Sequence, residues 1–307
     1  MRLYMVEATL LFFLDVGVRR LSFFVVPTHI TPILETNLLS LTVPLPENKR
    51  ESLKNAAGQH IYLQVPPESR EGTKPIADMC FNPFTIASVS EDGASMQLVL
   101  RMLHGPTSAM LKRLSKLPKA DPPLQIDGPY GSSAHFPNLA SFDRILLIAG
   151  GVGATFCLPM YRQIRKDIQK FGGSTTKAQF VWSMRAASEA GWATLTPSAE
   201  TVDIKSLTEE GIQLCITGLE NPAQPTNGSI DLLDLTRQQN GDAVGKPGSR
   251  RPDIKKIVDD VFSQGKHERV AVLVCGPRGM GRATRRAVSP WVGKGRNVWW
   301  HDEAFGW

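Results

Sequence analysis

Short apolar stretches separated by turn residues dominate the chain from Thr28 to about Gly131. Apolar or β-branched stretches of this kind, with Gly, Pro, Asn and Asp between them, are typical of β-strands. Strands in this number without long helices between them indicate an antiparallel barrel or sandwich. One short helix is expected over residues 108–117. The expected strands are Leu38–Val43, His60–Val65, Phe84–Ser88, Met96–Leu103 and Leu124–Ile126.

The pattern changes at about Arg144, where apolar strands begin to alternate with helices. Strands that alternate with helices predict a parallel, doubly wound sheet. The chain is therefore predicted to be a small β domain followed by an α/β domain, joined near residues 135–142. Trp299 is expected in a final strand that packs into the core. The other expected strands are Ile145–Ala149, Phe180–Met184, Ile212–Thr217 and Val270–Cys275, and the expected helices are 155–171 and 279–292.

Two segments between these elements are predicted to be loops. Pro66–Asp78 is polar and rich in proline, and Asn221–Pro252 is rich in Gly, Pro, Gln and Asn. Few apolar residues interrupt the second segment apart from Ile230–Leu235. Clusters of this composition punctuate regular structure, and neither segment is assigned any chemistry.

The N-terminal segment is apolar but short. Leu3–Leu14 is apolar apart from Glu7 and Thr9, and the pair Arg19–Arg20 follows. A membrane-spanning helix needs about 20 apolar residues, and the interruption at Glu7 argues against a signal peptide. Basic residues just inside an apolar stretch favour the cytosolic end of a membrane helix. The alternative is an amphipathic helix that packs on its own domain.

Composition and charge are those of a folded globular protein. The chain has 307 residues, of which 42% are hydrophobic and 21% are charged, enough for two domains of ordinary size. The net charge of +6 is compatible with a polyanionic cofactor or an acidic membrane face. Nucleic acid is not expected as a partner because the chain has no dense basic stripe. Its densest basic cluster, Arg282, Arg285 and Arg286, has the spacing of one helix face.

The cysteines point to a reducing compartment. The four cysteines lie far apart without a CxxC pair or a histidine at metal-ligand spacing. Neither a disulfide framework nor a zinc site is therefore expected. The cysteines are Cys80, Cys157, Cys215 and Cys275.

The segment Asn82-Pro83-Phe84-Thr85 in the β region could contact a flavin. Alternating side chains of a strand can place an aromatic ring against the flavin and a hydroxyl near its polar edge. Further on, Gly105-Pro106-Thr107-Ser108 lies between a strand and a helix, where backbone N–H groups suit a pyrophosphate. Taken alone, the first segment is more typical of an edge strand, and the second is more typical of a helix N-cap.

In the α/β domain a glycine turn, Gly150-Gly151-Val152-Gly153, joins the first strand to the helix that begins near Thr155. Glycines let a backbone approach a diphosphate at the positive end of a helix. The full GxGxxG pattern is absent because Phe156 occupies the last glycine position. Cys275-Gly276-Pro277 ends a later strand at the edge where such sheets bind ligands.

Taken in order, these segments resemble the ferredoxin–NADP⁺ reductase superfamily, and within it the ferric reductase and NADPH oxidase branch. The ending F-G-W and residues 251–253 look most like fungal ferric reductases. The resemblance runs from about Asp15 to the last residue. The segments that carry it are N-P-F-T (82–85), G-P-T (105–107), D-G-P-Y-G (127–131), GGVG (150–153), V-W-S-M-R (181–185), CGP (275–277) and E-A-F-G-W (303–307).

This resemblance implies an antiparallel β-barrel FAD-binding domain over residues 27–136 and an α/β doubly wound NAD(P)-binding domain over residues 141–307. Residues 1–26 would be the remnant of the last transmembrane helix. The implied cofactors are FAD and NADPH. The implied reaction moves a hydride from NADPH to FAD and releases the electrons one at a time, a chemistry that the cofactors supply.

The resemblance also implies roles for single residues. Phe84 would pack on the flavin and Thr85 would hydrogen-bond near its N5 edge. Cys275 would lie at the nicotinamide, and Phe305 would cover the flavin face that the nicotinamide must reach. Arg185 would bind the 2′-phosphate, because a guanidinium fork suits phosphate, although a solvated surface arginine is the alternative. The residues expected at FAD are Asn82, Pro83, Phe84, Thr85, Gly105, Thr107, Ser108 and Phe305, and those expected at NADPH are Gly150, Gly151, Gly153, Thr155, Arg185, Cys275, Gly276 and Pro277.

In the family, electrons pass to haem in a membrane domain and then to ferric iron. The six histidines of this chain are scattered outside any hydrophobic span, so it is not expected to bind that haem itself. A haem-bearing membrane domain is therefore the expected partner, at the cytosolic face of the plasma membrane. If the chain is a true truncation it would instead be a soluble cytosolic protein.

Two other functions remain open. An NADPH oxidase-like module would reduce dioxygen, and a truncated fragment would bind flavin without catalysis. Asn82 motivates the second of these, because it stands where the family usually has His or Arg. Asparagine still donates hydrogen bonds, so weaker retention of FAD is expected rather than none.

Overall fold

The computed structural model describes residues 2–54, 56–66, 82–102, 109, 111–112, 115, 121–170, 176–194, 204–218 and 251–303. The chain divides into two compact units. Unit 1 comprises Met1–Pro32 and Asn37–Ala134, and unit 2 comprises Ile33–Thr36 and His135–Trp307. Most of the predicted helix 108–117 and most of both predicted loops lie outside the described residues.

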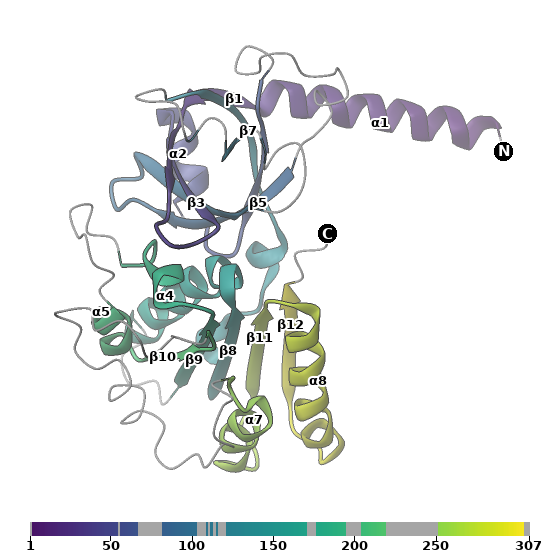
Figure 1. Cartoon of the computed structure of the whole chain (residues 1–307). Helices are drawn as coiled ribbons and strands as arrows, with labels where there is room; N and C mark the ends of the chain where they lie inside the picture. Colours follow the sequence, from purple (N-terminus) through teal and green to yellow (C-terminus); the bar gives the residue numbers. More distant parts are fainter. Residues whose placement is uncertain are drawn as a thin grey trace, which may run out of the picture. The chain divides into compact units, whose positions relative to one another are not determined.

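Unit 1 is built on an antiparallel sheet that curls into a near-barrel (Figure 1). Its seven strands lie in the order β1-β7-β4-β5-β6-β3-β2, and β1 also lies against β3. Side chains that alternate along the strands fill the interior, among them the fully buried Leu41, Ile61 and Leu98. The antiparallel barrel prediction is confirmed. The strands are β1 Phe24–Pro27, β2 His29–Pro32, β3 Leu38–Pro44, β4 His60–Gln64, β5 Asn82–Val89, β6 Ser95–Arg101 and β7 Pro123–Tyr130, and helix α2 Glu47–Leu53 and the 3₁₀ turn η3 Ser132–His135 lie between or after them.

The N-terminal segment forms the helix α1, Arg2–Ser22. Every residue from Tyr4 to Leu14 is exposed, including large apolar side chains such as Leu10 at 66% and Phe13 at 65%. The alternative of an amphipathic helix packed on its own domain is therefore wrong for these residues. No described helix combines the length and the apolar character needed to cross a membrane.

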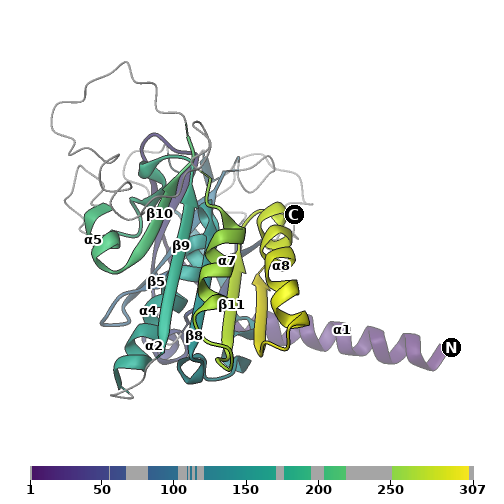
Figure 2. The same cartoon turned by 90° about the horizontal axis from the view of Figure 1, so that it is seen from below.

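Unit 2 contains a parallel sheet of five strands in the order β10-β9-β8-β11-β12. Helix α4 packs on one face of this sheet, and α7 and α8 pack on the other (Figure 2). The prediction of a doubly wound α/β domain is confirmed. The strands are β8 Arg144–Gly150, β9 Lys177–Met184, β10 Ile212–Ile216, β11 Val270–Cys275 and β12 Val298–Glu303. The helices are α4 Ala154–Lys170, α5 Ile204–Glu209, α7 Ile254–Ser263 and α8 Arg278–Gly293, with 3₁₀ turns η4 Leu139–Ser141, η5 Gly151–Gly153 and η6 Ala187–Ala190.

The strand order fixes where a ligand can bind in unit 2. From β8 the chain runs outward through β9 to β10, and it then returns to the other side of β8 with β11 and β12. The order therefore reverses between β8 and β11. In open α/β sheets ligands bind at such a switch point, beyond the carboxyl ends of the strands. Gly150 and Cys275 end these two strands.

Candidate cofactor-binding sites

The predicted glycine turn and the predicted CGP segment meet at the switch point of unit 2. Cys275 pairs with Ala149 of β8 on one side and with Glu303 of β12 on the other. A methyl group on Gly153 would overlap the carbonyl of Cys275, and one on Gly150 would press against Pro277. The two segments are thus in direct contact, and this contact requires glycine at residue 153.

The turn η5 leads straight into α4 and presents its backbone at the start of that helix. Gly151 has φ of 54°, in the left-handed region that glycine adopts without strain. The indole N–H of Trp182 donates to the carbonyl oxygen of Gly151 at 3.0 Å and so orients the turn. Gly151 and Val152 remain only half-buried. A helix start of this kind suits anionic groups such as a diphosphate, and the predicted contact of this turn with NADPH stays a prediction.

The Thr155 hydroxyl is used inside the turn. Its side chain is buried, and Oγ1 donates to the carbonyl oxygen of Val152 at 2.9 Å. The hydroxyl therefore stabilises the junction between η5 and α4. Its predicted contact with the NADPH diphosphate stays a prediction.

The Cys275 thiol is fully buried at the end of β11. Burial raises the pKa of this thiol well above its ordinary value, and the nearby Cys157, Glu303 and Asp302 raise it further. Cys275 is therefore a neutral thiol at physiological pH. A neutral thiol can contact a nicotinamide but is a weak nucleophile.

Arg185 follows β9 at the same carboxyl edge of the sheet. Its side chain is exposed, and it makes no ion pair with any residue in the described part of the chain. Its carbonyl oxygen accepts a hydrogen bond from Gly218 N at 2.7 Å, which fixes the backbone. A fixed backbone with an available guanidinium is suited to a phosphate group.

In unit 1 the predicted flavin-contacting segment lies on β5 between β4 and β6. Thr85 pairs with His60, and Phe84 pairs with the buried Ile61. Phe84 packs against the barrel core, and neighbouring residues of a strand point to opposite faces. Thr85 is 9% exposed, and its hydroxyl has no hydrogen-bond partner within the described ranges. A hydroxyl without an internal partner is available to a ligand.

A cluster of three rings lies beside Thr85. His60, Tyr62 and Tyr130 contact one another with ring centroids 5.6–6.3 Å apart. Tyr62 pairs with Pro83, and all three rings are half-buried. Tyr130 belongs to the D-G-P-Y-G motif, and its hydroxyl donates to Asp127 at 2.9 Å. The sheet register that joins the three could not be read from the motif alone.

Some predicted site residues lie outside the described ranges. This applies to the whole Gly105–Ser108 segment and to Phe305 at the C-terminus. Their predicted contacts with FAD stay predictions. Glu303, two residues earlier, is described and lies opposite Cys275.

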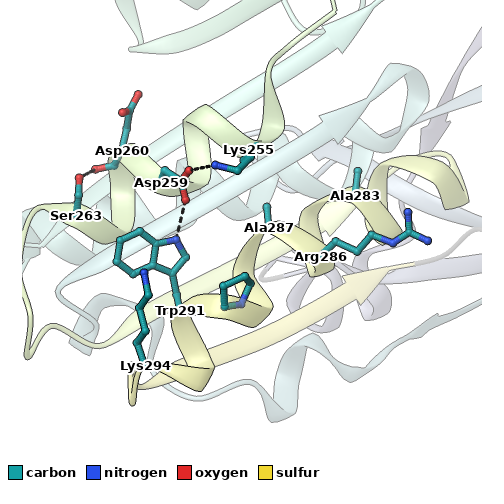
Figure 3. A pocket seen from close by; sticks show the side chains of 10 residues that line it. Lys255, Asp259, Asp260, Ser263, Ala283, Arg286, Ala287, Trp291 and Lys294 are labelled. Carbon is teal, nitrogen blue, oxygen red and sulfur yellow. Dashed lines mark hydrogen bonds and ion pairs between the residues drawn. The ribbon is translucent and has the colours of Figure 1, made fainter.

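A groove of about 720 Å³ lies elsewhere in unit 2, between α7 and α8. Figure 3 shows Lys255 and Trp291 converging on the carboxylate of Asp259, at 2.7 and 2.8 Å. The Lys294 ammonium lies over the Trp291 ring, 4.6 Å from its centroid. These four side chains of the groove thus contact one another, and none of the predicted cofactor-binding residues lines it.

Comparison with protein families assigns both units. Residues 23–134 match the family model described as FAD-binding domain, and residues 142–289 match the one described as ferric reductase NAD binding domain. The chain carries the FAD- and NAD-binding domains of the ferric reductase family. The two matches fall on the near-barrel and on the parallel sheet, so FAD and a nicotinamide nucleotide are the cofactors of this fold.

Two curated relatives represent the ferric reductases and oxidases of this family. The chain is 24% identical over 280 residues to respiratory burst oxidase homolog protein B of Solanum tuberosum, which covers 76% of this chain and 30% of that protein. It is 20% identical over 325 residues to ferric/cupric reductase transmembrane component 2 of Schizosaccharomyces pombe, which covers 88% and 52%. The ferric reductase-type chain thus spans about a third to a half of these relatives' length.

Solved structures agree on the fold. The cytochrome b5 reductase domain of Ulva prolifera nitrate reductase matches with a TM-score of 0.53 at 17% identity, over 91% of this chain and 97% of that domain. A likeness at this identity concerns architecture alone. The residues of this ferric reductase-type chain nevertheless fit the two cofactors. The glycine turn at a helix start fits a dinucleotide, and the available Thr85 hydroxyl beside a half-buried ring cluster fits a flavin.

Proposed function

We propose that this chain is the electron-transfer module of a ferric-chelate reductase, which takes electrons from NADPH through FAD to haem and ferric iron. The observation that carries the proposal is the direct contact of the glycine turn with the Cys275 segment at the switch point of unit 2. This contact joins the segment suited to a diphosphate to the segment proposed for the nicotinamide. Bound NADPH and FAD would supply hydride transfer and one-electron release.

The residues of the chain would bind and orient the two cofactors. The backbone of η5 and the start of α4 would hold the NADPH diphosphate, with Arg185 at the 2′-phosphate. Cys275, whose backbone is fixed between β8 and β12, would lie at the nicotinamide with its thiol neutral. Thr85 would donate its hydroxyl to the polar edge of the flavin. The segment Gly105–Ser108 would bind the FAD pyrophosphate, and Phe305 would shield the flavin.

A haem-bearing membrane domain is the proposed acceptor, with the module at the cytosolic face of the plasma membrane. Two observations support this. One relative is named a transmembrane component of a ferric/cupric reductase. Helix α1 exposes large apolar side chains from Tyr4 to Leu14, which water solvates poorly and which lipid or a membrane protein could cover.

An absorbance experiment on the full chain tests the proposal. After incubation with FAD and removal of excess, we expect flavin absorbance that bleaches anaerobically when NADPH is added. Re-oxidation by a ferric chelate should restore the colour. A colourless chain after incubation with FAD contradicts the proposal, because the barrel would then hold no flavin. Because Asn82 stands where the family usually has His or Arg, some FAD should be lost on extended dialysis.

A second candidate function is reduction of dioxygen, as in an NADPH oxidase. The similarity to a respiratory burst oxidase homolog favours it. The same reduced protein separates the two candidates. Faster re-oxidation by ferric chelate than by air supports the reductase, and rapid oxygen consumption with superoxide formation supports the oxidase.

A further inference from the structure

His301 and Glu303 form a pair on the final strand of unit 2. They are two residues apart on β12 and so point to the same face of the sheet. The distance between His301 Nε2 and Glu303 Oε2 is 2.9 Å. The side chains are 18% and 31% exposed, so the pair is neither free in water nor sealed in the core. Its geometry requires a proton on Nε2, because the carboxylate can only accept.

Three aromatic rings hold the imidazole of His301 in place. The Phe136 ring lies 4.5 Å from it between centroids, and the Phe156 ring lies 5.4 Å away with an interplanar angle of 28°. The Trp299 ring is nearly parallel to it, at 6.0 Å and 10°. Phe136 follows the turn η3, Phe156 lies in the first turn of α4, and Trp299 lies on β12. Because the imidazole cannot rotate freely among them, its Nε2 has a fixed direction toward Glu303.

This pair lies at the edge where the nicotinamide is proposed to bind. Glu303 is the direct partner of Cys275 in the register of β11 and β12. Its negative charge is one of the influences that raise the pKa of the Cys275 thiol, after burial and Cys157. Phe156 follows the glycine turn by three residues. The Phe156 ring that contacts His301 is thus attached to the turn proposed for the diphosphate.

We propose that His301 is a positioning residue for the nicotinamide, holding the Glu303 carboxylate beside the Cys275 end of β11. The proposal rests on the proposed function, because it requires a nicotinamide at this edge. Oxidised nicotinamide carries one positive charge and the reduced ring carries none, since they differ by one hydride. A carboxylate fixed nearby therefore favours the oxidised form. A carboxylate that could turn into solvent would favour the oxidised nicotinamide less strongly.

The competing explanation is that the pair only stabilises an edge strand. Such a structural role would change the affinity for every nucleotide alike. A positioning role changes only the discrimination between charged and uncharged nicotinamide rings. Variants can separate the two roles. His301→Phe keeps the ring contacts but removes the N–H donor, and His301→Gln keeps an N–H donor.

The test uses the full chain and three probes in isothermal titration calorimetry. NADP⁺ carries the charged ring, tetrahydro-NADP carries an uncharged ring that cannot transfer hydride, and 2′,5′-ADP carries no ring. We expect Glu303→Gln to lower the preference for NADP⁺ over tetrahydro-NADP about three- to tenfold. His301→Phe should lower it by a smaller factor, and His301→Gln should restore most of it. Binding of 2′,5′-ADP should stay unchanged in all three variants.

The outcomes are distinguishable. If the three variants bind 2′,5′-ADP normally and keep the wild-type preference for NADP⁺, the positioning role is wrong and the proposed function stands. If affinities for all three probes fall together, the pair is structural. If the wild type binds none of the probes, and no NADH or ADP either, the proposed function itself fails. Should His301→Phe not fold, Glu303→Gln still decides, because its side chain is partly exposed.

Discussion

Arg185 lies at the carboxyl end of β9, while Lys177 begins the same strand at its opposite end. Both side chains are exposed, but only Arg185 is at the edge where the nucleotide is proposed to bind. We expect Arg185→Ala to weaken NADPH binding about 10- to 100-fold, the loss of one or two charge-assisted hydrogen bonds. NADH binding should change little, because NADH lacks the 2′-phosphate.

Lys177→Ala is the matched control for this prediction. It removes one positive charge from the same strand and should leave both nucleotide affinities unchanged. Fluorescence titration of the two variants with NADPH and NADH measures the ratio of the two affinities in each variant. Equal losses for both nucleotides in Arg185→Ala would show that Arg185 does not recognise the 2′-phosphate.

Motifs predict residue types at a site better than they predict what each side chain contacts. The sequence marks Thr155 as a diphosphate ligand by its place after the glycine turn, but in the structure its hydroxyl donates to Val152. The sequence predicts both Phe84 and Thr85 at the flavin, but the two side chains point to opposite faces of β5, and Phe84 packs against the core. The ring cluster around Tyr130 depends on the pairing of β4 with β7. Hydrogen-bond partners and register are set by tertiary structure, which no local pattern contains.

The contact between the glycine turn and the end of β11 joins two elements that are 122 residues apart, from Gly153 to Cys275. We expect Gly153→Ala to destabilise unit 2 by about 1–3 kcal/mol, since the added methyl overlaps the Cys275 carbonyl and overpacking has costs of this order. NADP⁺ affinity should fall as well, because the two segments must separate. Chemical denaturation and calorimetric titration measure the two effects.

Gly279 provides the control in the first turn of α8. A methyl group there meets nothing within 4 Å, and alanine favours helices by about 1 kcal/mol over glycine. Gly279→Ala should therefore leave unit 2 as stable as before or more stable, with unchanged NADP⁺ affinity. If Gly153→Ala behaved like Gly279→Ala, the close approach of the two segments would not exist in solution.

Most elements with a strong local pattern were predicted, and the missed elements include two short strands and one helix whose pattern was legible. All five expected strands of unit 1 and all the expected strands of unit 2 are present within a few residues of their predicted bounds. The strands β1 and β2 were missed because each has four residues and ends in proline. Helix α7 was missed although Asp253 caps it, with its carboxylate accepting from Lys256 N at 3.0 Å. Its apolar spacing, with Ile257, Val258 and Val261 buried, was legible in the sequence.

At the scale of the whole molecule, the change of pattern near Arg144 predicted two architectures, but strand order could not be predicted in the same way. The first and last strands of unit 1, β1 and β7, are neighbours, and in unit 2 β8 lies beside β11. Pairings over such distances depend on closing long loops, whose entropy cost local sequence does not reveal. The resemblance to a known family implied the two fold classes, which the architecture confirms, but it was not used to predict a strand order.

Two separate cores make a prediction about unfolding. The barrel core includes Leu41 and Ile61, and the core of unit 2 includes Val258 and Val272, with no shared member. We expect two transitions in differential scanning calorimetry. FAD should raise the temperature of one and NADP⁺ that of the other, each by several degrees at about 100 times its dissociation constant, because such binding stabilises by about 2.7 kcal/mol.

Core variants assign the transitions. Leu41→Ala should lower the FAD-sensitive transition and Val272→Ala the NADP⁺-sensitive one, because truncation of a buried Leu or Val removes packing in its own core. Each variant should leave the other transition nearly unmoved. A single transition that both ligands raise and both variants lower would mean that the units unfold cooperatively. Cofactor binding to one domain would then stabilise the other, and neither site could be treated as independent.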